Sequence, residues 1–298
     1  MAAIVVGVLV AIQSKINAGL AAHVGSGFVA AAVSFGTGLV LAMVIVLSRQ
    51  PWRQAVGSIP ALVRQGSLRW WQLLGGLGGA WLVTTQGLVV VVVGVTIFTV
   101  GVVAGQVGGS LVVDRAGLSP AGTLPITAFR VVAAGLALAA VAVSGVRAGD
   151  LHLHVSWVVL LAVSAGLGIA VQQAINGRVA VATRQPLAAT LTNFVVGFSG
   201  LLLVCVVGVT LGLIDVGEWP TEWWWYLGGP IGVLFIALAA WAVHALGVLV
   251  FGLLSIAGQL LGSVLIDTLA PTGDAALGWP QWLGLVLVAA AVLLAQRR

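Results

Sequence analysis

The sequence predicts an all-α integral membrane protein with ten transmembrane helices, arranged as two five-helix repeats of inverted topology. Three observations predict this fold class. Only 6% of the 298 residues are charged and 61% are hydrophobic, whereas soluble chains carry roughly 25% charged residues. The apolar segments reach about 20 residues each, which is the length of a helix that crosses a bilayer. Polar residues also recur in register between the two halves of the chain.

Ten apolar segments can be placed along the chain. We expect spans at about residues 2–22, 28–48, 71–91, 94–113 and 127–146 in the first half, and at about 157–180, 188–212, 224–243, 247–266 and 281–296 in the second. The third and fourth spans meet near Gly94, and the eighth and ninth meet between His244 and Gly247. The polar stretch at 49–69 is expected to lie on the membrane surface. The two repeats, 1–146 and 157–298, are joined by a linker at 147–156.

The repeat holds at the level of single residues. A shift of 159 positions carries Gln13, Asn17, Ser34 and Phe35 to Gln172, Asn176, Asn193 and Phe194. Later in each half, a shift of 153 positions carries Gln106, Ser110 and Asp114 to Gln259, Ser263 and Asp267. Because five spans is an odd number, the second copy enters the bilayer from the opposite side. Such inverted repeats are typical of alternating-access transporters.

The basic residues predict the orientation. If the N-terminus defines one side of the membrane, ten of the twelve Lys and Arg residues lie on that side: Arg49, Arg53, Arg64, Arg69, Arg115, Arg130, Arg178, Arg184, Arg297 and Arg298. Arg147 belongs to the other side, and so does Lys15 if it reaches that surface. Cytoplasmic loops carry the excess of basic residues. We therefore expect a multi-pass protein of the bacterial cytoplasmic (inner) membrane with both termini in the cytoplasm.

The repeated motifs resemble one bacterial family. They are Gln-x-x-x-Asn in the first span of each half, "SFGTG" at 34–38, "NFVVG" at 193–197, and Gly-Gln-x-x-Gly-Ser at 105–110 and 258–263. In these motifs the chain is similar to the YdcZ-type inner-membrane exporters of the drug/metabolite transporter superfamily. Some members of that family are single five-helix chains that pair antiparallel, so this chain resembles a fused form. The resemblance implies a small-molecule transporter with a cavity between its halves, and it names no substrate.

Polar and aromatic residues within the spans are the candidates for substrate binding. Gln13 and Asn17 share one helix face because they are four residues apart. Amides buried in lipid need partners, so these residues either line a substrate path or clamp neighbouring helices, which is a common use of such side chains. Tryptophans in the spans either stack on a ligand ring or cation or pack against helices and lipid. The predicted set is Gln13, Asn17, Ser34, Trp81, Gln172, Asn176, Asn193 and Trp241.

Four ionisable residues are candidates for charge or proton coupling. Lys15 lies within the first span, where it either binds an anionic group or snorkels to the surface. Asp114 and Asp267 end the fourth and ninth spans, where they are either polar residues at the membrane surface or proton carriers. His244 lies at a joint between two spans, where it is either a proton-transfer group, a common role of histidine, or a residue of a solvated turn.

Glycines at small-x-x-x-small spacing predict close helix packing. Gly101, Gly105 and Gly109 lie in the fourth span, and Gly258 and Gly262 lie in the ninth. We expect these two spans to pack tightly, either on each other or across a homodimer. Whether the chain forms such a dimer is left open by the sequence.

The remaining chemistry of the sequence favours transport over catalysis. The chain has no phosphate-binding P-loop lysine motif, no cluster with metal-site spacing and no catalytic triad order, so we predict no enzyme, no metal and no cofactor. Nucleic acid is not an expected partner; the lipid bilayer and a small molecule are. The prediction is a secondary transporter, and an exporter by resemblance. The alternatives are a passive channel for a small solute or anion, and a non-transporting scaffold or lipid-handling protein.

Overall fold

The computed structural model consists of helices and their connections throughout the residues that it describes. The structure describes residues 1–145, 157–269 and 279–295. Within these ranges it describes only the backbone of residues 86–97, 144–145, 157–158, 263, 266–269 and 280–281. The elements are α1 (Ala2–Val24), α2 (Gly27–Ser48), α3 (Gln50–Arg64), η1 (Trp70–Leu73), α4 (Gly76–Arg115), α5 (Ala128–Gly145), α6 (Trp157–Thr183), α7 (Pro186–Thr210), η2 (Trp223–Tyr226), α8 (Gly228–Leu269) and α9 (Trp279–Ala295). Within the described residues, five helices are long and apolar enough to cross a membrane. The predicted linker at 147–156 lies outside the described residues.

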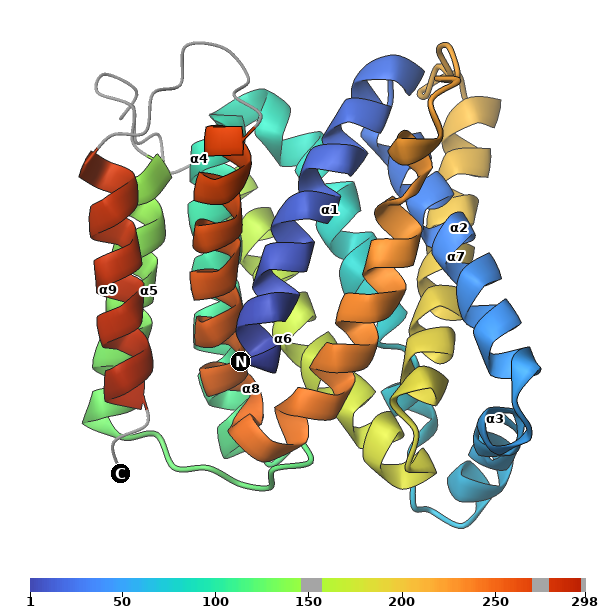
Figure 1. The fold of residues 1–298 in the computed structure, drawn as a ribbon, viewed down its shortest axis with the longest axis horizontal. Coiled ribbons are helices and arrows are strands. Elements are labelled where there is room, and N and C mark those ends of the chain that lie inside the picture. The colour runs from blue at the N-terminus through green and yellow to red at the C-terminus, as the bar shows by residue number, and fades with distance from the viewer. Residues whose placement is uncertain (146–156, 270–278, 296–298) are drawn as a thin grey trace.

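Two of the helices each contain two predicted spans. In α8 the backbone leaves helical geometry at Gly247, which has φ 73° and ψ 168°. This break lies within the predicted joint between the eighth and ninth spans and divides α8 into two arms. In α4, Gly78 and Gly109 both lie against the same turn of α6: an added Cβ would be 2.6 Å from the Gly168 carbonyl oxygen in the first case and 3.2 Å from the Leu167 Cα in the second. The chain of α4 therefore folds back between these glycines, as Figure 1 also shows.

Helix α1 packs closely on α8. A Cβ added to Gly7 would lie 2.0 Å from the carbonyl oxygen of Ser255, and one added to Gly258 would lie 2.1 Å from that of Ile4. Real Cβ atoms do not approach a carbonyl oxygen so closely, so only glycine fits at these positions. The two backbones are therefore in direct contact, which small residues permit in membrane helices. A Cβ on Gly262 would likewise lie 2.9 Å from the Cβ of Ala11.

Helix α6 packs on α4 through the matching residues of the other half. A Cβ added to Gly166 would lie 1.9 Å from the carbonyl oxygen of Val102, and one added to Gly105 would lie 1.9 Å from that of Val163. Gly166 is 159 positions after Gly7, and Gly105 is 153 positions before Gly258. The α1–α8 and α6–α4 contacts thus involve equivalent residues, and each joins the first helix of one half to the hairpin of the other half. The glycines predicted to pack the fourth and ninth spans on each other or across a homodimer lie, within the chain, against α6 and α1.

Equivalent helices run in opposite directions. In the view of Figure 1, α1 rises from the N-terminus and α6 descends, while α2 descends and α7 rises. The connections at the ends of α1 and α6 match as well. Gly25 and Arg184, which are 159 positions apart, both have positive φ angles, of 72° and 55°. Arg184 is the one non-glycine residue with a positive φ among the described residues, so the turn geometry is retained in the second half without glycine.

The outer elements complete the bundle. Helices α5 and α9 lie side by side at the left of Figure 1. They share a core with the second arm of α8 that is rich in small residues, including Ala133, Ala137 and Ala291. On the opposite side of the bundle, α2 packs against α7. Helix α3 forms the polar stretch predicted at 49–69, and only Ala55 and Ile59 of its residues are buried. It lies at one end of the bundle, below the spans (Figure 1).

The glycine contacts predict a large loss of stability on substitution. We expect Gly7→Val and Gly166→Val to destabilise the protein to a similar degree, because each added side chain would overlap the backbone of the partner helix. Overpacking of this kind costs typically 1–3 kcal/mol or more, which corresponds to a fall in Tm of roughly 2–10 °C. The measurement is thermal unfolding of the purified variants in detergent.

Gly135→Val is the matched control for both variants. Gly135 lies in α5 with no atom within 4 Å of an added Cβ, so this variant should keep nearly the wild-type Tm. Equal losses for all three variants, or no loss for the first two, would contradict the packing described.

Candidate functional site

The polar residues predicted in α1 and α2 meet at the start of α8. The Gln13 amide donates a hydrogen bond of 2.7 Å from Nε2 to the carbonyl oxygen of Gly228. A Cβ added to Gly228 would lie 2.1 Å from Asn17 Oδ1 and 2.8 Å from Ser34 Oγ. The absence of a side chain at Gly228 thus allows three polar groups from two helices to converge on one turn. We call this set, Gln13, Asn17, Ser34 and Gly228, the first amide cluster.

The second half contains the equivalent cluster. Asn176 Nδ2 donates to Asn193 Oδ1 at 2.9 Å, and both side chains are buried. A Cβ added to Gly75, the counterpart of Gly228, would lie 2.3 Å from Asn176 Oδ1. Gln172 lies one turn away, beside Gly78. We call this set, Gln172, Asn176, Asn193 and Gly75, the second amide cluster. The two clusters use matched residues but differ in their hydrogen bonds.

Several polar atoms in these clusters are buried without a hydrogen-bond partner. They are Asn17 Oδ1, Gln172 Oε1 and Asn193 Nδ2. A buried polar atom without a partner costs roughly 1–3 kcal/mol, and such atoms are uncommon in native proteins. All three lie where α1, α2, α6 and α7 approach the hairpins of the opposite half. The arrangement is therefore one in which a ligand or a second conformation could supply the missing partners.

A cavity of about 400 Å³ lies between α4 and α6, next to the second amide cluster. It contains two of the predicted residues, Trp81 and Gln172. The Trp81 indole donates from Nε1 to Ser164 Oγ at 3.0 Å, and Ser164 in turn donates to the Leu161 carbonyl oxygen at 2.7 Å. This chain of hydrogen bonds fixes the orientation of the Trp81 ring. The lining residues are Trp71, Leu74, Gly75, Leu77, Gly78, Trp81, Ser164, Leu167, Gly168, Val171, Gln172 and Ile175.

A larger and more apolar cavity, of about 770 Å³, lies between α2 and α7. Among its lining residues only Thr37, Cys205 and Thr210 carry a hydroxyl or thiol group, and the Thr37 hydroxyl already donates to the backbone. None of the predicted substrate-binding residues lines this cavity. The cavity between α4 and α6 is smaller, and in it the Trp81 ring lies with the hydrogen-bonding groups of Ser164 and Gln172, a combination found in small-molecule sites.

The other predicted residues lie apart from both cavities. Trp241 is 54% exposed on α8, and its ring packs edge-on against that of His244. His244 is itself exposed, and its Nδ1 contacts the Trp241 carbonyl oxygen. Lys15 is half-buried in α1. The side chain of Asp267 lies outside the described residues.

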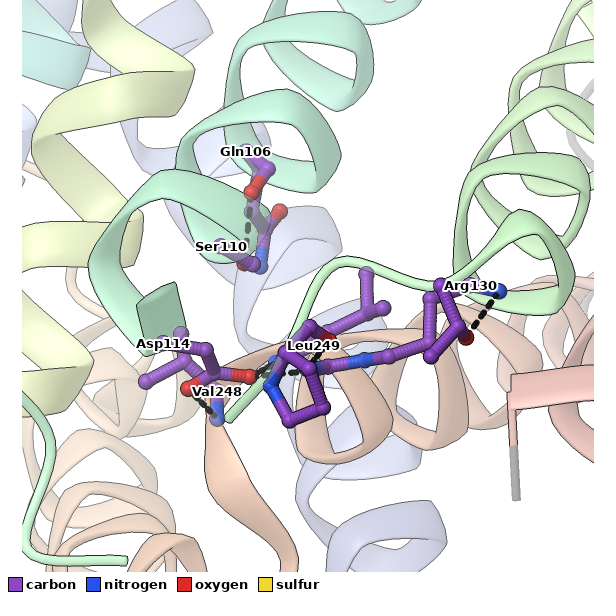
Figure 2. Close-up of polar contacts among 8 residues, drawn as sticks. Gln106, Ser110, Asp114, Arg130, Val248 and Leu249 are labelled. Atoms are coloured by element: carbon purple, nitrogen blue, oxygen red, sulfur yellow. Dashed lines mark hydrogen bonds and ion pairs between the residues drawn. The ribbon is translucent and has the colours of Figure 1, made fainter. Parts of the chain in front are cut away.

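Asp114 is fully buried, in contrast to the expectation of a surface residue at a helix end. Figure 2 shows its carboxylate between α4, α5 and α8. The carboxylate pairs with the Arg130 guanidinium, with 2.5 Å between Oδ2 and Nη2. It also accepts hydrogen bonds from the backbone N–H groups of Val248 and Leu249, at 2.8 and 3.2 Å. Because these N–H groups begin the second arm of α8, Asp114 caps that arm at the Gly247 break.

The interaction between Asp114 and Arg130 was not predicted from the sequence. Arg130 was assigned only as a positive charge on one side of the membrane, and the residue 153 positions later is Leu283, so the repeat gives no signal for the pair. Ser164 and the glycine pair Gly7 and Gly166 were also missed. The glycine pair could have been found, because the same shift of 159 positions that relates the amides relates these glycines.

The Asp114 pair predicts a strong effect of removing one partner. We expect Asp114→Asn to lower the stability by roughly 3–5 kcal/mol, because Arg130 would remain buried without its counter-ion. Combining it with Arg130→Met should restore part of this loss, and a double-mutant cycle on thermal unfolding measures the coupling. Asp215→Asn, at an exposed position, is the control and should change little. Additive losses for Asp114 and Arg130 would contradict a direct ion pair.

Comparison with known proteins gives one family and a shared fold. The model of the family described as "Putative inner membrane exporter, YdcZ" matches residues 1–143 and 157–294, in two segments. Seven chains of solved structures also match. One, titled "Crystal structure of protein", has a TM-score of 0.67 and 18% sequence identity, and the match covers 99% of this chain and 94% of that one. This likeness extends to the fold alone. No curated protein matches the chain.

Proposed function

Because the chain belongs to the YdcZ family of inner membrane exporters, a family of membrane transporters, we propose that it exports a small organic molecule by alternating access. In this proposal the chain is a secondary transporter in which two inverted five-helix repeats rock against each other. The family match in two segments, 1–143 and 157–294, agrees with a two-repeat form. The substrate would bind between elements of the two repeats, as in other transporters built from inverted repeats.

The observation that carries this proposal is the pair of equivalent helix contacts. Gly7 meets Ser255 and Gln259 as Gly166 meets Val102 and Gln106. Each contact joins the first helix of one repeat to the hairpin of the other, and the paired helices run in opposite directions (Figure 1). Two equivalent, oppositely directed contacts are the geometry expected if the repeats are inverted and can exchange their conformations.

The two amide clusters differ in their hydrogen bonds, and an exchange of conformations between the repeats would reverse this difference. At present Gln13 donates to the Gly228 carbonyl oxygen, whereas the equivalent Gln172 has its Oε1 without a partner. In the opposite state, Gln172 would donate to the carbonyl oxygen of Gly75, the counterpart of Gly228, and Gln13 would be released. Each state would then leave one cluster with polar groups available to the substrate.

The orientation follows from the basic residues. With ten of the twelve Lys and Arg residues on the side of the N-terminus, both termini would be cytoplasmic by the positive-inside rule. The cap at Gly247 would then lie at the cytoplasmic end, and the short 3₁₀ helix η2 at the outer end. Because Asp114 is engaged by Arg130 and by two N–H groups, we do not assign proton coupling to it.

Cysteine labelling tests the inverted topology. Ser26 and Gln185 are equivalent positions, 159 residues apart, between the first two helices of each repeat. We expect Ser26→Cys and Gln185→Cys, each in a Cys205→Ser background that removes the single native cysteine, to react with a membrane-impermeant maleimide from opposite sides. Intact spheroplasts should label the first and inside-out vesicles the second. Labelling of both from the same side would refute inverted repeats.

Transport can be tested directly in proteoliposomes loaded with a mixture of small bacterial metabolites. The protein should release one class of compound faster than empty liposomes do. The double variant Gln172→Ala, Asn176→Ala should reduce that release by about tenfold or more, the loss expected from removing about 1.4 kcal/mol or more of polar contacts to substrate. Gly108→Ala, at an exposed helical glycine with open space around it, is the control. Unchanged release in the double variant would remove the second amide cluster from the mechanism.

A further inference from the structure

The two repeats differ in the residues that line the cavity between α4 and α6. Four residues that line this cavity have bulky apolar counterparts in the other repeat. The matched pairs are Ser164 and Val5, Gly168 and Leu9, Gly78 and Ile231, and Trp81 and Leu234. At these four positions the residues that line the cavity are small, polar or aromatic, whereas the other repeat has bulky aliphatic residues.

The small residue at Gly168 is not required by helix packing. An added Cβ at this position would lie 3.6 Å from the Gly78 Cα and 3.9 Å from the Trp81 ring, which are ordinary van der Waals distances. Gly105 and Gly166 are different, because a Cβ there would overlap a backbone atom. Since contact between the helices does not explain the glycine at 168, we attribute it to the open volume of about 400 Å³ beside it.

The groups around this volume define the chemistry of a ligand. The Trp81 ring offers an aromatic surface whose orientation is fixed by its hydrogen bond to Ser164. Gln172 is half-buried at the cavity, and its Oε1 has no partner. Rotation about the last side-chain bond, which is a soft torsion, would direct this oxygen to a donor in the cavity. None of the described residues that line the cavity is charged, so a ligand ion would have no counter-charge within the membrane.

We infer that this cavity binds a neutral, planar aromatic compound that carries an N–H or O–H donor. Its ring packs against Trp81, and its donor bonds to Gln172 Oε1. Ser164 is a positioning residue, since it acts through the orientation of Trp81. The volume lies near the lower end of the range for small-molecule sites, so it suits one or two fused rings. The assignment of this cavity as the transporter's substrate site rests on the proposed function. The inference that the cavity binds such a compound does not depend on it.

Binding of indole to the purified protein in lipid nanodiscs tests this inference. Radiolabelled indole is a neutral, planar probe with one N–H donor, and 1-methylindole has nearly the same shape without the donor. We expect saturable binding of indole and roughly tenfold weaker binding of 1-methylindole, the difference expected from one buried hydrogen bond. Gln172→Leu should weaken indole binding by a similar factor and leave 1-methylindole unchanged.

Gly168→Leu tests the location of the site, because it introduces the residue found at the equivalent position of the other repeat. This variant should abolish saturable binding of both probes. Gly135→Leu, the same change at an open glycine of α5, should bind as the wild type does, and the monodispersity of both variants shows that they fold. A third variant, Ser164→Ala, should weaken both probes to the same degree, since it removes the group that fixes Trp81.

Each outcome decides the inference. Loss of binding in Gly168→Leu but not in Gly135→Leu supports it. Saturable binding that persists in Gly168→Leu overturns it, and so does non-saturable partitioning in every variant, which would indicate that lipid acyl chains fill the cavity. Transport in proteoliposomes separates the two proposals. Site-specific binding without any transport would contradict the proposed function alone, whereas transport of another compound that is unaffected by Gly168→Leu would contradict the assignment of this cavity alone.

Discussion

The fold depends on backbone contact between the first helix of each half and the hairpin of the other half. Water does not drive apolar helices together inside a bilayer, so helix association relies on close packing and polar contacts. Gly7 against Ser255 and Gly166 against Val102 provide this packing at equivalent places. The close approach carries Gln13 to Gly228 and brings Asn176 beside Gly75. The amide clusters are thus a consequence of the glycine contacts, and neither half can form its cluster alone.

The same constraint explains why the asymmetries of the structure are informative. Gly105 and Gly258 are equivalent positions at which the helix contacts require glycine, and both halves retain it. Gly168 differs from its counterpart Leu9, and backbone packing does not impose this difference, because an added Cβ at Gly168 would make only ordinary van der Waals contacts. The buried pair of Asp114 and Arg130 is a second difference, and it fixes the break in α8 at one end of the bundle. The first helix of the second half thus lines a cavity with polar groups, together with α4, whereas the break in α8 is capped by Asp114 of the first half.

The sequence was sufficient to predict the helical membrane fold, the membership of the exporter family and the break near Gly247, because each depends on local composition or on a repeated motif. The partners of the glycines could not be predicted, since spacing reveals that a helix packs closely but not which helix it meets. Gly105 was expected to face the ninth span and lies against α6. The ion pair of Arg130 could not be predicted, because the positive-inside pattern already accounts for its charge. The cavity could not be predicted because it depends on distances between α4 and α6. The assignment of substrate-binding residues stays a prediction.

The central claim, that two equivalent halves exchange conformations about these contacts, is tested most directly by distance measurements between spin labels in lipid nanodiscs. One pair, at Ser26 and Trp279, spans the end of the bundle opposite the N-terminus; its repeat equivalent, at Gln185 and Ile126, spans the other end. The account predicts two distance populations for each pair, with any ligand that lengthens one distance shortening the other. A single, unchanging distance at both ends, or changes of the same sign, would contradict alternating access and indicate a fixed scaffold.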